Sequence, residues 1–122
     1  MIGIRNLTVA FRSSRGATTA VDGVSFQVEA GRSFGIVGES GSGKSTILRA
    51  ITGLVPDWTG RIDIDGEALG KSRSKRFYRT AQMVFQDPYA SLHPMQTVKH
   101  ILEEPLAIHG IGDRRGRIER AL

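Results

Sequence analysis

The sequence predicts an α/β fold, and two observations lead to this prediction. A short apolar run at 34–37 is typical of a buried strand, and a glycine-rich stretch and then apolar residues at helical spacing follow it. On both sides of this strand–loop–helix unit, shorter segments alternate between apolar and polar residues, as half-buried antiparallel strands do. We therefore expect a buried strand with its helix, an N-terminal antiparallel β subdomain and, toward the C-terminus, the start of a helical subdomain.

The N-terminal part of the sequence is predicted to form two antiparallel strands. The first strand is marked by near-alternating apolar residues at Ile4, Leu7, Val9 and Phe11. The second strand is marked by strict alternation at Val24, Phe26 and Val28. Between them, the polar and glycine-containing stretch 13–19 is expected to be a hairpin loop. Ala30-Gly31 is expected to turn the chain into the apolar run at 34–37.

The glycine-rich stretch carries the motif G-x-x-x-x-G-K-[ST], formed by Gly38, Gly43, Lys44 and Ser45. Glycines let the backbone curl so that successive N–H groups point into one hollow, and the start of the following helix adds unpaired N–H groups and a positive dipole end. Lys44 can contact the β- and γ-phosphates, and the Ser45 hydroxyl can join a Mg²⁺ shell. The motif therefore predicts a partial P-loop NTPase core that binds a nucleoside triphosphate.

The residues expected to bind the nucleotide form one continuous segment. They are Gly38, Glu39, Ser40, Gly41, Ser42, Gly43, Lys44, Ser45 and Thr46. The alternative interpretation is a flexible Gly/Ser loop that matches the motif by chance. The flanking strand and helix patterns disfavour it, because the motif requires this context.

Beyond the loop, the sequence predicts a helix and then a short strand. Ile47, Leu48, Ile51 and Leu54 follow helical spacing, and Gly53 is expected to end the helix before a Pro-Asp turn. The following strand is marked by Ile62 and Ile64, which alternate with aspartates. We expect a short edge-type strand that ends in the Asp-Gly turn at 65–66.

Five cations then lie within nine residues, at Lys71, Lys75 and three arginines, Arg73, Arg76 and Arg79. We interpret this stretch as a solvated helix face, and a contact with nucleic acid or lipid is the alternative. The net charge of +5 is compatible with anionic partners such as a nucleotide, nucleic acid or a membrane surface. The absence of cysteine excludes disulfides and cysteine-ligated metals, and no apolar run is long enough to span a membrane.

The C-terminal third is predicted to hold another strand and two helices. Residues 83–85 indicate a buried strand, Thr97 is a candidate N-cap, and Pro105 is expected to break the helix that follows it. A last helix starts near Asp113, and its apolar pattern stops at Leu122. This ending indicates a longer native protein. A frayed terminal helix in a complete small protein is the alternative.

These motifs together resemble the N-terminal half of an ABC transporter ATP-binding subunit. The resemblance rests on the segments 20–26, 38–46, 60–62 and 83–92, and it extends over essentially the whole chain. The wording Gln-Asp-Pro-Tyr-Ala-Ser-Leu at 86–92, with Glu-Pro-Leu at 104–106, resembles the oligopeptide, dipeptide and nickel import branch.

The resemblance implies roles for individual residues. Residues 38–46 match the Walker A loop, with Lys44 on the phosphates of ATP and Ser45 on Mg²⁺. Gln86 matches the Q-loop glutamine, which touches Mg²⁺ and the γ-phosphate region, so Lys44 and Gln86 are the candidate catalytic residues. Phe11 matches the aromatic residue that stacks on adenine, although as a strand residue it could equally belong to the core.

The resemblance also implies an organisation and partners. Residues 1–70 would form the β subdomain with the P-loop strand and helix, 71–95 the Q-loop region, and 96–122 the start of the helical subdomain. The protein would couple ATP hydrolysis to the transport of peptides or nickel, on the cytoplasmic face of the cell membrane. Its partners would be transmembrane permease subunits and a second ATP-binding subunit, and nucleic acid is not expected.

The sequence departs from the family pattern in ways that affect catalysis. No apolar strand ending in Asp and followed by Glu, no Ser-Gly-Gly-Gln signature and no switch histidine occur within these 122 residues. His93, His100 and His109 lie too early for the switch and are expected to be surface residues. We therefore expect nucleotide binding with little turnover by the isolated chain, and poor solubility or dimer formation, because a strand edge would lack its neighbour.

Two other classes of function remain open at this point. One is a nucleic-acid-associated P-loop ATPase of the ABC superfamily, which the basic charge permits and the wording around Gln86 disfavours. The other is a P-loop kinase of a small molecule, for which no lid-like cluster of arginines is identifiable. Salt-sensitive retention of DNA or RNA would favour the first class. Consumption of ATP that depends on a specific small-molecule acceptor would favour the second class.

Overall fold

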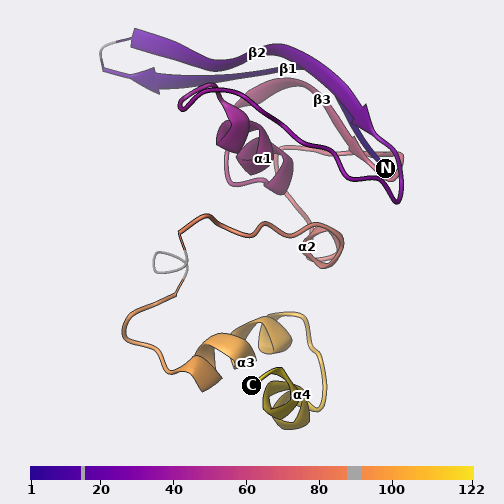
Figure 1. Ribbon diagram of the computed structural model, residues 1–122, viewed down its shortest axis with the longest axis vertical. Helices are drawn as coiled ribbons and strands as arrows, with labels where there is room; N and C mark the ends of the chain where they lie inside the picture. Colours follow the sequence, from indigo (N-terminus) through magenta and orange to yellow (C-terminus); the bar gives the residue numbers. More distant parts are fainter. Residues whose placement is uncertain (15, 88–91) are drawn as a thin grey trace. The chain divides into compact units, whose positions relative to one another are not determined.

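The computed structural model describes residues 1–14, 16–87 and 92–122. Its contacts divide the chain into two units, Met1–Ala81 and Gln82–Leu122. The first unit contains β1 (Ile2–Ser13), β2 (Gly16–Val28), α1 (Lys44–Thr52), β3 (Trp58–Ile64), β4 (Glu67–Ala68) and α2 (Phe77–Thr80). The second unit contains α3 (Val98–Ile108) and α4 (Arg114–Ala121) (Figure 1). These units are groups of contacts, so the functional division at residues 70 and 95 stays a prediction.

The first unit is built on an antiparallel sheet with the strand order β2-β1-β3-β4 (Figure 1). β1 and β2 form the hairpin that the sequence predicts, but the loop between them is shorter than the predicted stretch 13–19. Strand β2 already begins at Gly16, and Thr18 pairs with Phe11. The two threonines at 18 and 19 are β-branched and favour a strand, which explains why the pairing extends into the polar stretch.

Strand β3 is longer and more central than the predicted edge strand. It begins at Trp58 and lies between β1 and the two-residue strand β4. The predicted Asp-Gly turn is confirmed, since Asp65 and Gly66 have φ angles of 49° and 82°. Positive φ at both central residues gives a turn whose twist matches that of the flanking strands. The turn adds β4 to the sheet edge, so β3 is an inner strand.

The hydrophobic core of the first unit lies between the sheet and helix α1. The sheet side is formed by fully buried residues of β1 and β3, among them Ile4, Leu7, Val9 and Ile62. Helix α1 packs against β1 and β2 and buries Ile47, Ala50 and Ile51. The predicted stop is confirmed, because Gly53 caps the helix with a φ of 85°, in the left-handed region that glycine adopts readily.

The apolar runs at 34–37 and 83–85 do not form the strands that the sequence predicts. Phe34 stacks on Phe26 with ring centroids 5.0 Å apart, and Ile36 packs on the core, but Val37 is 92% exposed. In the second unit Val84 is 95% exposed. A buried strand needs neighbours to pair its N–H and C=O groups, and no segment among the described residues pairs with either run. The predicted tendency to associate remains to be tested.

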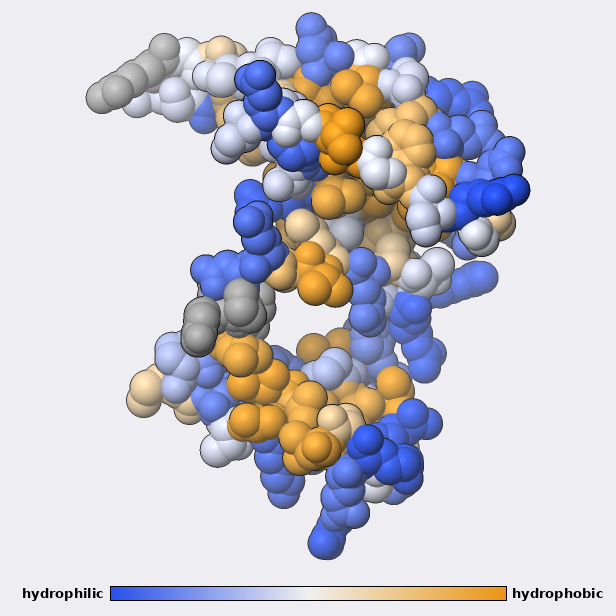
Figure 2. Space-filling view, in the orientation of Figure 1, coloured by the Kyte–Doolittle hydropathy of each residue, from blue (hydrophilic) through white to orange (hydrophobic). Residues whose placement is uncertain are grey.

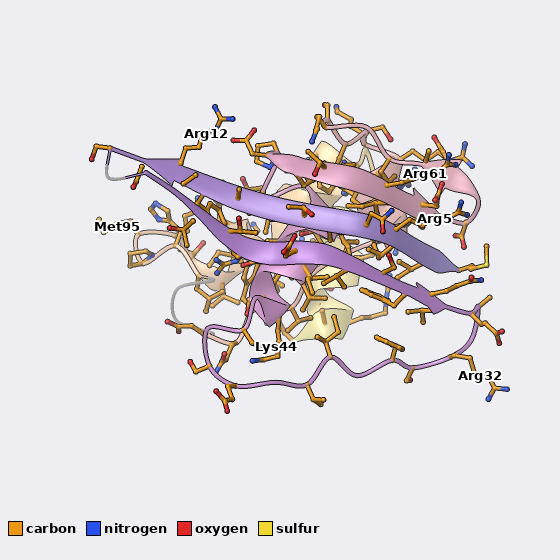
Figure 3. The ribbon with its side chains drawn as sticks, turned by 90° about the horizontal axis from the view of Figure 1, so that it is seen from above. Arg5, Arg12, Arg32, Lys44, Arg61 and Met95 are labelled. Carbon is orange, nitrogen blue, oxygen red and sulfur yellow. The ribbon has the colours of Figure 1, made fainter. Side chains whose placement is uncertain are left out.

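Strand β3 carries a buried carboxylate that is paired with an exposed arginine. Asp63 is 8% exposed, and both of its oxygens accept hydrogen bonds from Arg61 Nε at 2.9 Å. Figure 3 shows Arg61 and Arg5 at the same end of the sheet, where the two residues face each other across β1 and β3. The hydrogen bond from Arg61 lowers the pKa of Asp63 below its ordinary value, against the opposing effect of burial.

The first unit is therefore expected to lose stability in acid partly through Asp63. Because the pKa of Asp63 is lower in the folded state, its stabilisation is complete above the unfolded value of about 4 and is lost as the pH falls through the folded value. Urea unfolding at pH 7 and pH 3, followed by Trp58 fluorescence, measures this loss. The Asp63→Asn variant should lose less stability between the two pH values than the unchanged chain. An equal loss would contradict this role.

The second unit is a pair of helices, and side chains cap both of them. The Thr97 side chain accepts from the His100 N–H at 3.3 Å, which confirms the predicted N-cap of α3. Pro105 lies inside α3, so the prediction that it breaks the helix is wrong. Proline has a φ angle compatible with a helix and removes one N–H, and here the helix continues to Ile108. Figure 2 shows hydrophobic side chains gathered over α3.

Helix α4 starts where the sequence predicts. The Asp113 side chain accepts from the Gly116 N–H at 3.3 Å, and Arg120 donates to Asp113 at 3.1 Å. These hydrogen bonds, with that of Arg120 the largest, lower the pKa of Asp113. Of the apolar residues of this helical pattern, Ile118 is buried, whereas Leu122 at its end is 81% exposed.

Candidate functional site

The glycine-rich loop of the first unit is a bent segment that leads directly into α1. The predicted turn at 30–31 is confirmed, with Arg32 N donating to Glu29 O at 3.2 Å. The loop itself folds back where Ser42 N donates to Glu39 O at 3.2 Å. Gly41 and Gly43 have φ angles of 81° and 91°, so the backbone bends twice through the left-handed region before the helix begins.

Gly43 fixes the loop against the sheet. A Cβ atom at this position would lie 2.3 Å from the main-chain oxygen of Ala20 and 3.2 Å from a methyl group of Val21, both on β2. Gly43 is also buried. Only glycine combines the positive φ with this close approach, because any side chain would collide with main-chain atoms. The loop and the start of α1 are therefore held in place by the hairpin.

Lys44 folds over the loop and closes it (Figure 3). Its Nζ donates to Gly38 O at 2.9 Å, to Glu39 O at 2.5 Å and to Ser42 Oγ at 3.3 Å. The ammonium group has three protons, so these contacts engage all of its donors. The result is a positive charge held among main-chain atoms at the point where the motif predicts a phosphate.

The first turn of α1 offers main-chain donors to a ligand. The N-cap is Gly43, which has no side chain, and the first turn carries no acidic residue. The first main-chain hydrogen bond of the helix is donated by Ile47 N to Gly43 O at 3.0 Å. The amides of residues 44–46 thus precede the intrahelical pattern, and the helix dipole places positive charge beside them. Ser45 in this turn is exposed.

The other predicted site residues lie apart from the loop in sequence and are only partly placed. Phe11 lies on β1, is 47% exposed and does not belong to the buried core. Gln86 lies in a bend of the second unit, and its placement at the phosphates stays a prediction. The adjacent motif residues 88–91 lie outside the described part of the chain.

The basic stretch 71–79 is only partly the solvated helix face that the sequence predicts: four of its five cations are exposed, but Arg73 is half-buried and most of the stretch is not helical. Its helix α2 has only four residues, and Phe77 from it enters the core. Lys71 Nζ lies 4.1 Å from the centre of the Trp58 ring and donates to the Trp58 carbonyl. Arg73 donates to carbonyls at the end of α1. Sequence reasoning missed these roles because nothing in the spacing separates these two cations from their neighbours.

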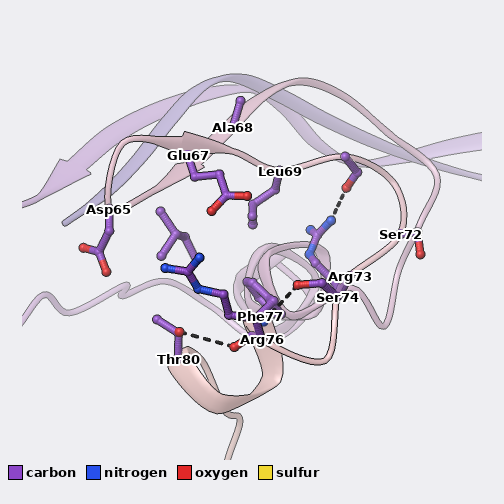
Figure 4. A pocket seen from close by; sticks show the side chains of 12 residues that line it. Asp65, Glu67, Ala68, Leu69, Ser72, Arg73, Ser74, Arg76, Phe77 and Thr80 are labelled. Atoms are coloured by element: carbon purple, nitrogen blue, oxygen red, sulfur yellow. Dashed lines mark hydrogen bonds between the residues drawn. The ribbon is translucent and has the colours of Figure 1, made fainter.

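The first unit also has a pocket that the loop does not line. Its volume is about 230 Å³, and it lies between the β3–β4 hairpin and α2 (Figure 4). Glu67 and Arg76 are among its lining residues, and none of the predicted phosphate-binding residues is. Among the described residues, no cluster of histidine, aspartate and glutamate has the composition of a metal site. No helix in the described ranges is long and apolar enough to cross a membrane.

The motif G-x-x-x-x-G-K-[ST], the helix that begins at its glycine-rich loop and the lysine folded over that loop are features of P-loop proteins. The family model described as "ABC transporter" matches residues 21–122. The chain therefore belongs to the ABC transporter family. This family is the one that the sequence motifs resemble.

The chain is similar to curated proteins over nearly its whole length. The oligopeptide transport ATP-binding protein OppF of Bacillus subtilis is 42% identical over 125 residues, which cover 98% of this chain and 41% of that protein. The protein of the same name from Streptococcus mutans is 38% identical over 130 residues, which cover 100% of this chain and 42% of that protein. The chain thus spans about two fifths of the length of these relatives.

The fold is similar to that of solved ATP-binding cassettes. A dimeric structure of the cassette MJ0796 in a post-hydrolysis state, bound to ADP and Pi, has a TM-score of 0.78 and 26% sequence identity. The match covers 98% of this chain and 55% of that chain. The predicted α/β P-loop fold with an antiparallel β subdomain is therefore confirmed.

Proposed function

We propose that the chain is the N-terminal part of the ATP-binding subunit of an ABC importer and that residues 38–46 bind ATP with Mg²⁺. The observation that carries this proposal is that Lys44 Nζ is held by the carbonyls of the loop that leads into α1, a helix whose N-cap has no side-chain hydrogen bond. A triphosphate matches this combination of a point charge and oriented N–H groups. The residues present fit the nucleotide, because a glycine N-cap leaves the first helical turn without a competing side chain.

Individual residues would divide the work of binding. Lys44 would hold the β- and γ-phosphates. To do so, its Nζ would give up its longest hydrogen bond, which it donates to Ser42 Oγ at 3.3 Å, and donate to a phosphate oxygen instead. The exposed Ser45 would supply a hydroxyl to Mg²⁺, which neutralises phosphate charge when bound. Phe11 would stack on adenine, and its 47% exposed ring has the free area that stacking needs. Gln86 would contact the Mg²⁺ and γ-phosphate region.

The proposal extends to the whole protein and its partners. It would hydrolyse ATP and couple hydrolysis to the import of peptides or nickel, together with transmembrane permease subunits at the cytoplasmic face of the membrane. The names of the relatives support oligopeptides as the substrate class. The dimeric MJ0796 structure supports a second ATP-binding subunit as a partner. Hydrolysis would require a carboxylate that orients water, so we expect the 122-residue chain to turn over ATP well below about 1 s⁻¹.

Nucleic acid as the main partner is the weaker candidate. Two of the five cations in the stretch 71–79, Lys71 and Arg73, donate to carbonyls of the chain itself. These contacts tie both side chains to the fold, and Arg73 is also half-buried, so it contributes less to a basic surface than the sequence indicates.

Replacing Lys44 with alanine is expected to weaken ATP binding by roughly 10-fold or more, since one charge-assisted contact contributes about 1.5–3 kcal/mol. Titration calorimetry with ATP and Mg²⁺ measures the effect. The matched control is Lys75→Ala, which removes the same charge from an exposed side chain of the same unit and should bind as the unchanged chain does. Equal affinities for the two variants would overturn the proposed function.

A further inference from the structure

Arg73 holds the C-terminal end of helix α1, the end opposite the phosphate-binding loop. The Arg73 guanidinium donates through Nε to Ile51 O at 3.2 Å and through Nη2 to Ala50 O at 2.8 Å and to Ile51 O at 3.1 Å. Its Nη1 donates to the Gly70 carbonyl (Figure 4). The last carbonyls of a helix lack partners in the regular helical pattern. Ala50 O also accepts from Gly53 N at 3.3 Å, whereas Ile51 O receives two hydrogen bonds from Arg73 and so does not need water.

The packing around Arg73 is specific for a planar cation. Its Cζ lies 5.9 Å from the ring centre of Trp58 and 5.3 Å from that of Phe77. Gly53 makes room for the side chain, because a Cβ there would lie 2.6 Å from Arg73 Cγ. A lysine could keep the charge and reach one carbonyl, but it could not supply a fork of donors or a plane that faces two rings.

The position of this contact connects it with the loop at the other end of the helix. Helix α1 has nine residues, which corresponds to a rod of about 13 Å. On such a short rod, a change in tilt at the C-terminal end moves the first-turn amides and Lys44 by a similar amount. A cation at the C-terminus also matches the helix dipole, and α1 has Arg49 but no acidic residue in its terminal turns.

We propose that Arg73 is a positioning residue for the nucleotide site: it clamps the C-terminal carbonyls of α1 and so holds the loop-facing end of the helix in the geometry that binds phosphate. This inference rests on the proposed function. It assigns a role to Arg73, which is half-buried, whereas the other four cations of the stretch are exposed.

The first experiment compares two conservative variants that keep the net charge. Arg73→Lys is expected to weaken ATP binding about 10-fold, because it loses the fork of donors and the stacking. Arg79→Lys, its matched control on α2, should stay within about 2-fold of the unchanged chain. Affinity is measured per folded molecule, with the folded fraction taken from circular dichroism and Trp58 fluorescence. Loss of stability alone therefore does not count as loss of affinity.

The second experiment tests the clamp by chemical rescue. Arg73→Ala leaves a hole between Trp58 and Phe77, and guanidinium at low millimolar concentration should restore at least half of the lost affinity by filling it. Urea, which has a similar shape and no charge, should not rescue. If Arg73→Ala does not fold, the Arg73→Lys result decides the question.

Hydrogen exchange separates this inference from the proposed function. The Ile47 amide, which donates to Gly43 O at the start of α1, should exchange faster in Arg73→Lys than in the unchanged chain, while the β1–β2 amides keep their rates. If the unchanged chain binds no ATP, the proposed function is wrong, and this exchange pattern alone decides whether Arg73 orders the loop-facing end. Unchanged ATP affinity in Arg73→Lys and Arg73→Ala, or unchanged exchange of the Ile47 amide in Arg73→Lys, would overturn the role of Arg73.

Discussion

Replacing Gly43 with alanine is expected to abolish detectable ATP binding and to destabilise the first unit by more than about 2 kcal/mol. The φ angle of 91° alone costs an alanine roughly 1–2 kcal/mol. The new methyl group would also lie 2.3 Å from the carbonyl oxygen of Ala20, and main chain cannot move away as a flexible side chain can. The loop must therefore separate from β2, which displaces the first-turn amides of α1. ATP titration and urea unfolding measure the two effects.

The matched control for this substitution is Gly66→Ala, outside the loop. Gly66 also has a positive φ, of 82°, but no atom lies within 4 Å of the position that its Cβ would take. This variant should pay only the backbone cost of about 1–2 kcal/mol and keep most of its ATP affinity. If the two alanine variants behave alike, contact between Gly43 and β2 does not hold the loop.

The Leu7→Ala variant should lose about 2–5 kcal/mol of unfolding free energy, the usual cost of removing a buried leucine side chain. Leu7 has no exposed surface and lies on β1 in the cluster that faces α1. The surroundings are strands paired on both sides, so the cavity has little room to collapse. Urea unfolding followed through Trp58, the one tryptophan of the sequence, reports on this unit.

Leu54→Ala is the control for this core substitution. Leu54 follows the end of α1 and is 55% exposed, so its truncation should change the unfolding free energy by less than about 1 kcal/mol. Similar losses for Leu7→Ala and Leu54→Ala would mean that the sheet and α1 do not enclose a packed core.

Features set by local chemistry were predictable from the sequence. The loop motif, the stop at Gly53, the Asp-Gly turn at 65–66 and the cap at Thr97 each depend on a few adjacent residues. In these cases the required φ angle or hydrogen bond belongs to the residue type itself. The family assignment was predictable for the same reason, since it rests on contiguous motifs.

Features that depend on distant partners were not predictable in the same way. An apolar run such as 34–37 indicates that a strand is possible, but pairing requires a neighbour that the run does not specify. The start of β2 at Gly16 depends on the length of β1 opposite it. Arg73 resembles the other cations of its stretch in sequence, and only the fold brings it to the carbonyls of α1. The same limit applies to Gln86, whose contact with a nucleotide remains a prediction.

The composition of the core has a consequence for the synthesis of the protein. Every residue of the cluster between the sheet and α1 comes from positions 4–77. This unit can therefore collapse while the ribosome is still making the chain, before α3 and α4 have left it. The exposed apolar residues Phe34 and Val37 would then be accessible on the nascent chain, where a chaperone that binds extended apolar segments could bind them first.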